Sequence, residues 1–426
     1  MQHQDPNAAS SSRQPDPHPP RRKRQRTNRR RPRPPTQRYP PLGPDDDRGY
    51  FEFYSHLGVH EEMLKDHVRT STYRKAIMYH QASIEGKVVL DVGCGTGVLA
   101  IFCAQAGARK VYAVEACEFA GLVNTVVEEN KLSDIIDVLH GRVEEVEIHE
   151  QVDVIVSEWM GYMLVFESML ASVIAARDRW LKQDGLILPS SALLYMAPIT
   201  HPERYSETID FWRDVHGIDM SVIRPYAKQC AFQDPCVETI TPANILAWPH
   251  LVTCINCHTI TIPELESFQT SFNMRSVRKA PLHGFAFWFD VDFTGSNQPT
   301  YSPIRSTQAT SILVTPPTRT QPAPNWEQVQ NIASTEAALE MLDLPLPPSG
   351  DGHNIPPPVL STAPNEPSTH WEQTVLYFYD PVDVENNQVI EGTLTLSQNP
   401  TNKRFLNIRL DLILGGLILK KETTLR

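Results

Sequence analysis

The stretch KVVLDVGCGTG (87–97) decides the fold of this chain of 426 residues. Its aliphatic run predicts a buried strand over 87–93, and Gly93, Gly95 and Gly97 stand between that strand and a predicted helix. Glycines here let the backbone turn sharply and let a ligand approach closely. The stretch predicts a nucleotide-like ligand site, although the glycines alone also suit a dinucleotide or a purely structural turn.

The residues around this stretch continue the alternation of strand and helix. Predicted strands lie at 110–116, 135–141 and 152–156. Predicted helices separate or precede them, at 59–80, 98–106 and 118–130. Such an order implies a parallel, doubly wound sheet. We therefore expect a Rossmann-like domain over 49–189, with an additional helix at its N-terminal end.

The pattern changes after Gly185 and Pro189, where helical spacing gives way to β-like alternation at 283–293 and 374–384. This predicts a second domain over 190–426, antiparallel and β-barrel-like. Two stretches interrupt it. The first, at about 201–228, predicts a helical excursion with an aromatic cluster. The second, at about 294–367, holds 14 of the 36 prolines and predicts a largely disordered insertion, with a short helix around 334–342.

Charge is divided unevenly along the chain. Residues 1–44 carry eleven Lys and Arg and two Asp, whereas the rest carries 28 basic and 48 acidic residues. The range 1–48 is too poor in large apolar residues to fold and predicts a disordered basic tail. Its run RRKRQRTNRRRPRP (21–34) is typical of nuclear import or nucleic-acid contact. The acidic remainder favours basic protein partners.

Composition also excludes several classes. No run of about 18 apolar residues is present, and the N-terminus is polar, so neither a membrane span nor a signal peptide is expected. The seven cysteines are scattered and odd in number, which suits a reducing compartment. Cys254 and Cys257 form a C-x-x-C without a second pair at zinc-ribbon spacing, so no metal site is expected.

Acidic residues near the other strand ends narrow the choice of ligand. Glu115 ends the second strand, where a carboxylate accepts hydrogen bonds from ribose hydroxyls. Asp91 precedes the glycines and is placed to orient the loop or meet the ligand's amino group. Val143 and Glu144 follow the third strand, at the depth of an adenine edge. No second nucleotide site is visible, so the spacing favours S-adenosylmethionine over a dinucleotide.

Two carboxylates, Glu158 and Glu167, flank the apolar turn in SEWMGYMLVFESM (157–169). They follow the strand predicted at 152–156 and precede a predicted helix. A pair of acids on a loop at a strand's C-terminal end is poorly placed for packing but well placed to hold a cation. Beside a methyl-donor site, that cation is expected to be an arginine guanidinium.

Five motifs in order resemble the type I protein arginine methyltransferase family. The first two are YFEFY (50–54) and HEEMLKDHVRTSTYR (60–74), and the others are VLDVGCGTG, the SEWMGYMLVFESM turn and THW (369–371). The resemblance covers about 50–293 and 361–410. The runs at 101–116, 200–212 and 283–291 are most similar to the sixth member of that family in its plant form.

The resemblance implies a role for each matching residue. On the cofactor side, Arg69 would pair with the methionine carboxylate, and His60 and Met63 would line the sulfur end. Tyr50 and Tyr54 would close over the cofactor as a lid and contact the arginine. The other implied cofactor contacts are Gly93, Gly95, Glu115, Val143 and Glu144. Taken singly, each of these residues also has an ordinary structural explanation.

On the catalytic side, Glu158 and Glu167 would hold the substrate guanidinium by charge-assisted hydrogen bonds. His370, paired with Asp66, would be the proton route or a brace for the site, and Trp371 would contact the substrate. The resemblance implies mono- and asymmetric dimethylarginine as products, on Arg-rich proteins such as histones, in the nucleus and possibly the cytoplasm. It also implies a homodimer formed through the helical excursion.

Two alternatives stay open at this point. The chain could be a methyltransferase for another acceptor, although the acidic pair would repel a carboxylate. It could also be a catalytically weak regulator that binds nucleic acid or protein through its basic tail.

Three features depart from the family pattern. They are Cys94 in place of serine, the long insertion, and the apolar C-terminal run at 413–426, whose strand pairing is uncertain.

Overall fold

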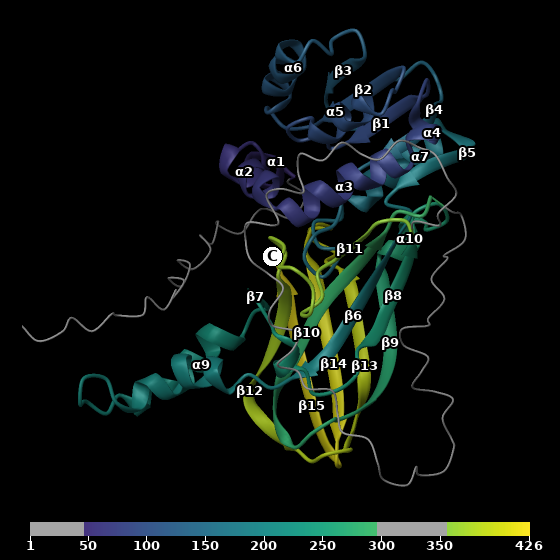
Figure 1. The fold of residues 1–426 in the computed structure, drawn as a ribbon. Coiled ribbons are helices and arrows are strands. Elements are labelled where there is room, and N and C mark those ends of the chain that lie inside the picture. The colour runs from purple at the N-terminus through teal and green to yellow at the C-terminus, as the bar shows by residue number, and fades with distance from the viewer. Residues whose placement is uncertain (1–46, 296–355) are drawn as a thin grey trace, which may run out of the picture. The chain divides into compact units, whose positions relative to one another are not determined.

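The computed structural model describes residues 47–295 and 356–426. Most of the expected basic tail, and the helix expected around 334–342, lie outside these ranges. No helix within them has the length and apolar character needed to cross a membrane. Two kinds of architecture follow one another along the chain, an α/β part and a mostly antiparallel part, as Figure 1 shows by colour and label.

From residue 47 onward, four helices precede the first strand. The single helix expected at 59–80 is divided, because Asp66 has an extended backbone (φ −74°, ψ 90°) and accepts a hydrogen bond from the main-chain nitrogen of Arg69. Aspartate is a favoured helix N-cap for this reason. The bounds are α1 (Arg48–Tyr54), α2 (Leu57–Lys65), α3 (His67–Tyr79) and α4 (Gln81–Ile84).

The parallel sheet has the order β3-β2-β1-β4-β5. Its strands are β1 (Val88–Val92), β2 (Lys110–Glu115), β3 (Ile136–His140), β4 (Val152–Val156) and β5 (Leu181–Leu188). The helices packed on it are α5 (Val98–Gln105), α6 (Ala120–Glu129) and α7 (Leu170–Trp180). The chain leaves β1 toward β2 and later returns to the other side of β1 as β4. In such sheets, ligands bind in the crevice beyond the carboxyl ends of these two strands.

The antiparallel part consists of two sheets. One has the order β7-β12-β10-β6-β8, with β11 also paired to β10, and the other has the order β15-β14-β13-β9. The bounds in the first sheet are β6 (Ser191–Ile199), β7 (Cys236–Glu238), β8 (His250–Asn256), β10 (Ala280–Asp292), β11 (Val359–Ser361) and β12 (Gln373–Val384). Those in the second are β9 (Ser267–Arg275), β13 (Val389–Gln398), β14 (Leu406–Leu414) and β15 (Leu417–Leu425). Phe272 of β9 and Phe285 of β10 join the sheets, with ring centroids 5.6 Å apart. The expected α/β plus β fold class is thus confirmed.

The helical excursion lies between β6 and β8. It contains α8 (Pro202–Thr208), η1 (Asp210–Arg213), η2 (Ser221–Ile223) and α9 (Arg224–Phe232), and the short α10 (Ile262–Leu265) and η3 (Pro242–Asn244) follow it. The excursion therefore extends four residues beyond the expected end at 228. Several of its apolar side chains are exposed, which is unusual for residues of this size. They are Phe211, Ile218, Val222 and Tyr226.

Two expected boundaries need correction. Residues 359–361, placed within the insertion, form β11 and pair with β10 from Asp290 to Asp292. The tail was placed up to 48, but α1 begins at Arg48 and Asp47 is bonded to Arg404 and Arg142. The strand pairing of the C-terminal run at 413–426, which the sequence leaves open, is that of a hairpin: Gly415 and Gly416 adopt positive φ angles and connect β14 to its antiparallel partner β15.

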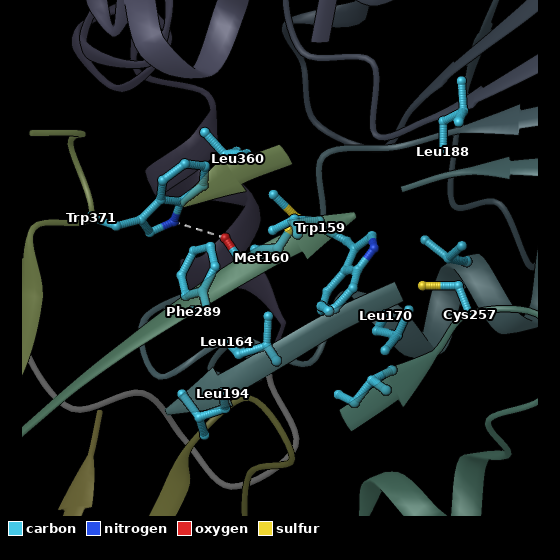
Figure 2. Close-up of a cluster of buried hydrophobic side chains, with 14 of the residues drawn as sticks. Trp159, Met160, Leu164, Leu170, Leu188, Leu194, Cys257, Phe289, Leu360 and Trp371 are labelled. Atoms are coloured by element: carbon cyan, nitrogen blue, oxygen red, sulfur yellow. Dashed lines mark hydrogen bonds between the residues drawn. The ribbon is translucent and has the colours of Figure 1, made fainter. Parts of the chain in front are cut away.

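A buried cluster joins the double-glutamate turn to the antiparallel part, and Figure 2 shows its side chains. The Trp371 indole nitrogen donates a 3.0 Å hydrogen bond to the Met160 carbonyl oxygen and lies against Phe289, with ring centroids 5.3 Å apart. Leu164 is also buried in this cluster. The apolar residues between Glu158 and Glu167 therefore belong to the core, which fixes the turn that carries the two acids.

Candidate active site

A single pocket collects most of the residues singled out in the sequence. It lies beyond the carboxyl ends of β1, β2 and β4, which is the crevice expected from the sheet order. The predicted residues that line it are Tyr50, Tyr54, His60, Met63, Arg69, Gly93, Gly95, Glu115, Val143, Glu144, Glu158 and Glu167. His370, Asp66 and Trp371 do not line it.

The glycine loop and Glu115 form one wall of this pocket. Gly93 and Gly95 have φ angles of 69° and 55°, a region that favours glycine. A Cβ on Gly93 would lie 2.2 Å from the Met169 methyl group. Glu115 accepts hydrogen bonds from the main-chain nitrogens of Gly95 (2.8 Å) and Cys117 (3.0 Å), one on each oxygen. Each oxygen keeps a second lone pair for a ligand.

Asp91 is enclosed beneath the loop. It is fully buried and does not line the pocket, so it does not meet a ligand directly as one of its two expected roles required. Burial raises the pKa of Asp91 to about 8, which makes the neutral acid dominant at neutral pH. Within the described residues neither carboxyl oxygen makes a hydrogen bond to the loop, so the expected loop-orienting role stays a prediction.

Glu144 and His60 line other parts of the pocket, and each has its own contacts with the protein. Glu144 accepts a 2.7 Å hydrogen bond from the Ser172 hydroxyl of α7 and lies 3.7 Å from Arg142. The His60 ring stacks on Phe119 with centroids 4.1 Å apart. One of its nitrogens, Nε2, lies 2.7 Å from the Tyr54 carbonyl, while Nδ1 is buried without a protein partner in the described part of the chain.

Arg69 and Glu158 form an ion pair inside the pocket. The Nε and Nη2 atoms of Arg69 donate to Oε2 of Glu158 at 3.0 and 2.8 Å, and both side chains are less than a tenth exposed. Arg69 also donates to the Met63 carbonyl at 3.3 Å. Both bonds to Glu158 fall on one oxygen, and within the described residues no hydrogen bond reaches Oε1. Arg69 thus orients one acid of the pair.

Glu167, the second acid, is held by Tyr54, whose hydroxyl donates a 2.8 Å hydrogen bond to Oε2. Burial raises the pKa of Glu167 to about 7. The Tyr54 hydrogen bond and the charge of Arg404 oppose this rise, while the charge of Glu158 adds to it. A carboxyl group with such a pKa changes charge near neutral pH.

His370 and Asp66 pair outside the pocket. Oδ2 of Asp66 lies 2.7 Å from His370 Nδ1 and accepts the His370 main-chain N–H at 2.9 Å. Burial raises the pKa of Asp66, but these bonds and the one from the Arg69 main chain outweigh it and lower the pKa. Asp66 caps the same helix that carries Arg69. Of the two roles expected for His370, this geometry favours the brace.

Trp371 was expected to contact the substrate, and this expectation is wrong for the structure. The side chain is buried and bonded to the Met160 carbonyl, with its ring 3.9 Å from that of His370. The indole packs against the turn between the two glutamates and does not line the pocket. It acts on the site through that turn.

Several residues of the site were not predicted from the sequence. Ser157 donates a 2.8 Å hydrogen bond to the Val92 carbonyl and ties the end of β4 to the end of β1. Arg404 lines the pocket and contacts Asp47. Ser157 lies beside Glu158 within a quoted motif and could have been noticed, whereas Arg404 is remote from every motif. Within 47–295 and 356–426, no group of His, Cys, Asp and Glu suits a metal ion.

Comparisons with known proteins bear on this site. Residues 190–328 and 328–416 match a family model described as the arginine methyltransferase oligomerization subdomain. The protein described as "Probable protein arginine N-methyltransferase 6" of Arabidopsis thaliana is 54% identical over 391 residues, covering 92% of this chain and 84% of the relative. This chain belongs to the protein arginine N-methyltransferase family. The expected similarity to the sixth plant member is confirmed.

Other members of the family are similar over comparable lengths. Protein arginine N-methyltransferase 6 of Danio rerio is 40% identical over 374 residues, covering 87% of this chain and 90% of that protein. Residues 71–193 also match a model described as ribosomal protein L11 methyltransferase. That match lies within the α/β part and shows its similarity to this second methyltransferase model.

Solved structures agree on the fold of both parts. A Trypanosoma brucei PRMT1 enzyme-prozyme heterotetrameric complex with AdoHcy has a TM-score of 0.68 at 31% identity, covering 88% of this chain and 99% of that one. The Arabidopsis thaliana protein arginine methyltransferase 10 has a TM-score of 0.67 at 31% identity, covering 88% and 100%. Its structure is described as uniquely open.

Proposed function

We propose that this chain uses S-adenosylmethionine to form mono- and asymmetric dimethylarginine on Arg-rich proteins, histones among them. The observation that carries the proposal is that the half-buried acids Glu158 and Glu167 line the same pocket as the glycine loop. Each acid is oriented by one internal partner, Arg69 or Tyr54. A guanidinium offers the planar set of N–H donors that two carboxylates bind best.

The pocket residues fit the proposed cofactor. Glu115 has lone pairs free for ribose hydroxyls, and Glu144 stands farther along the pocket where an amino group would be received. The unpartnered Nδ1 of His60 lies beside Gly95 and supplies a buried polar contact for a ligand. The Trypanosoma relative is described with AdoHcy, the product of methyl donation, which supports the same assignment.

The protein's own residues need only hold the guanidinium and accept one proton. When bound, S-adenosylmethionine supplies an electrophilic methyl group on a positively charged sulfur. A guanidinium is a poor nucleophile because its lone pairs are delocalised. Glu158 and Glu167 draw the positive charge toward the nitrogens they hold and leave the remaining nitrogen richer in electrons. The nitrogen that gains the methyl group loses one proton, and Glu167, with its raised pKa, is suited to accept it.

A methylation assay on two matched peptides tests the proposal. An arginine-rich histone-tail peptide and its lysine-substituted twin would be incubated with the enzyme and labelled S-adenosylmethionine. We expect transfer to the arginine peptide alone, and mass spectrometry of the hydrolysed product should find asymmetric dimethylarginine. Transfer to neither peptide, or equal transfer to both, would contradict the proposal. Symmetric dimethylarginine would contradict the product assignment alone.

We also propose that the enzyme acts as a homodimer. The family model matched by residues 190–416 is described as an oligomerization subdomain, and one solved relative is a heterotetramer. The exposed apolar side chains of the helical excursion supply a surface that association would cover.

The nucleus is the proposed location, because residues 21–34 form a basic run typical of import signals. Fluorescently tagged full-length chain and a variant lacking residues 1–44 would be compared in cells. We expect loss of nuclear accumulation on deletion. An unchanged distribution would refute import through this segment, and binding of the tail to nucleic acid would then be the use to examine.

A further inference from the structure

Arg404, in the loop between β13 and β14, reaches two parts of the pocket at once. Its Nε donates a 2.8 Å hydrogen bond to Asp47, the residue just before α1, and its Nη1 donates a 2.7 Å bond to the Glu167 carbonyl oxygen. The main-chain nitrogen of Glu167 donates in turn to the Arg404 carbonyl at 2.9 Å. The Arg404 side chain is only 15% exposed.

The same guanidinium covers an aromatic ring of the lid. It lies 3.7 Å from the ring centroid of Tyr50 and 5.5 Å from that of Phe51, both in α1. Such cation–π contacts are strong when water is excluded. Asp47 holds a second cation, Arg142, at 2.6 Å. The start of α1 is thus pinned by two arginines, but only Arg404 also touches the double-glutamate turn.

The turn needs this support because its backbone is strained. Glu167 and Ser168 have φ angles of 70° and 60°, an uncommon region for residues other than glycine. Such conformations persist where the surroundings determine them. Here the bonds from Arg404, and a hydrogen bond from Gln398 to the Ser168 hydroxyl, all come from the region of β13 and the loop that follows it.

We propose that Arg404 is a positioning residue that couples closure of the lid, residues 48–54, to the placement of Glu167. The Arg404 side chain joins the lid to the double-glutamate turn. One group therefore holds both the closed lid and the direction in which the Glu167 carboxylate points toward the substrate. Tyr54 lies on the lid and bonds to Glu167 as well, which places this acid between two contacts that depend on closure. The role in turnover rests on the proposed function, whereas the coupling itself is structural.

Hydrogen exchange and kinetics on three variants test this role. Arg404→Gln should speed amide exchange in both 48–54 and 165–168 by about tenfold, the effect of losing a charged hydrogen bond. Asp47→Asn, which weakens only the bond at the start of the lid, should speed exchange by that amount in 48–54 and by less in 165–168. Arg409→Gln, which alters an exposed arginine of β14 paired with Asp411, should change neither segment.

The kinetic and binding constants of these variants should differ in the same way as their exchange rates. Arg404→Gln should lower kcat at saturating substrates by about 100-fold, since a small misplacement of a holding group has that effect. It should also weaken S-adenosylmethionine binding about tenfold in calorimetry. Asp47→Asn should weaken that binding to a similar extent and lower kcat less than Arg404→Gln does, because it leaves the Arg404 bond to Glu167 in place. Arg404→Lys keeps the charge but not the fork of donors, so it should restore binding better than kcat.

Several outcomes would overturn the proposal. Wild-type exchange at both segments in Arg404→Gln would do so, and so would faster exchange spread evenly over the chain, which marks a residue of general stability. If Arg404→Gln does not fold, the exchange rates and kinetic constants of Arg404→Lys and Asp47→Asn test the proposal by the same outcomes. A wild-type enzyme that transfers no methyl group would refute the proposed function, while the exchange pattern would still test the coupling.

Discussion

Two acids buried close together are unfavourable unless each has a compensating partner, and the partners here differ in kind. Glu158 has a cation, Arg69, whereas Glu167 has a neutral donor, Tyr54. The pKa of Glu167 is therefore raised by burial and by the charge of Glu158. This difference implies that Glu167 limits activity at low pH.

Replacing either acid by its amide should remove most turnover. Glu158→Gln and Glu167→Gln each lose the charge that holds a guanidinium, so we expect kcat/KM for an arginine peptide to fall by at least about 100-fold. Affinity for S-adenosylmethionine, measured by calorimetry, should stay close to wild type. Glu85→Gln, an exposed change beside α4, is the matched control. Near-full turnover in either variant would refute the role of that residue.

The pH dependence of kcat/KM should report Glu167. The folded pKa is about 7, so the carboxylate needed to hold the substrate forms as pH rises through 7, and activity should rise with it. Tyr54→Phe removes a hydrogen bond that lowers this pKa, so the rising limb should move to higher pH. The exposed Tyr79→Phe serves as control. A limb that stays in place in Tyr54→Phe would contradict the assignment.

At the scale of elements, turns and caps fix the site more than the strands do. The helix expected over 59–80 divides at Asp66, and the cap formed there orients both Arg69 and the THW loop. Aspartate ahead of a helical run is a recognisable N-cap signal. The bond to His370 carries no such signal, because its two residues lie 304 positions apart.

Gly161 offers a test of the double-glutamate turn as an element. A Cβ at this position would lie 2.2 Å from the Phe166 carbonyl oxygen, so Gly161→Ala must shift the backbone beside Glu167. We expect a fall in kcat on the order of 100-fold with cofactor affinity retained. Gly58→Ala, where nothing lies within 4 Å of the added carbon, is the control. Equal turnover by both variants would show that the turn tolerates the shift.

At the scale of the whole molecule, the exposed apolar residues of the helical excursion and the acidic body are the two surfaces to which the proposed function assigns partners. The excursion leaves Val222 and Tyr226 largely exposed, at 80% and 70%. An acidic body attracts Arg-rich chains over distances set by salt. The proposed association of two copies and capture of substrate would therefore depend on these surfaces and not on any single motif of the site.

Charge placed on the excursion should separate the proposed dimer. The double change Val222→Glu and Tyr226→Glu should convert a dimer to a monomer in light scattering after gel filtration, and activity should fall with it. Trp248→Glu alters a similarly exposed aromatic residue, two positions before the start of β8, and should leave the mass unchanged. A wild-type protein that is monomeric at micromolar concentration would contradict the dimer, and a dimeric double variant would contradict this surface.

By itself the sequence determined the local units: the strand and glycine loop at 87–97, the acids at strand ends, the β alternation after Pro189 and the basic tail. These follow from periodicity and residue chemistry within short windows. Only the tertiary structure decided that Trp371 packs away from the pocket, that Arg69 holds Glu158, and that Arg404 joins the lid to Glu167. Those contacts connect residues at least 89 positions apart, and local patterns carry no information about which distant side chain fills a given space.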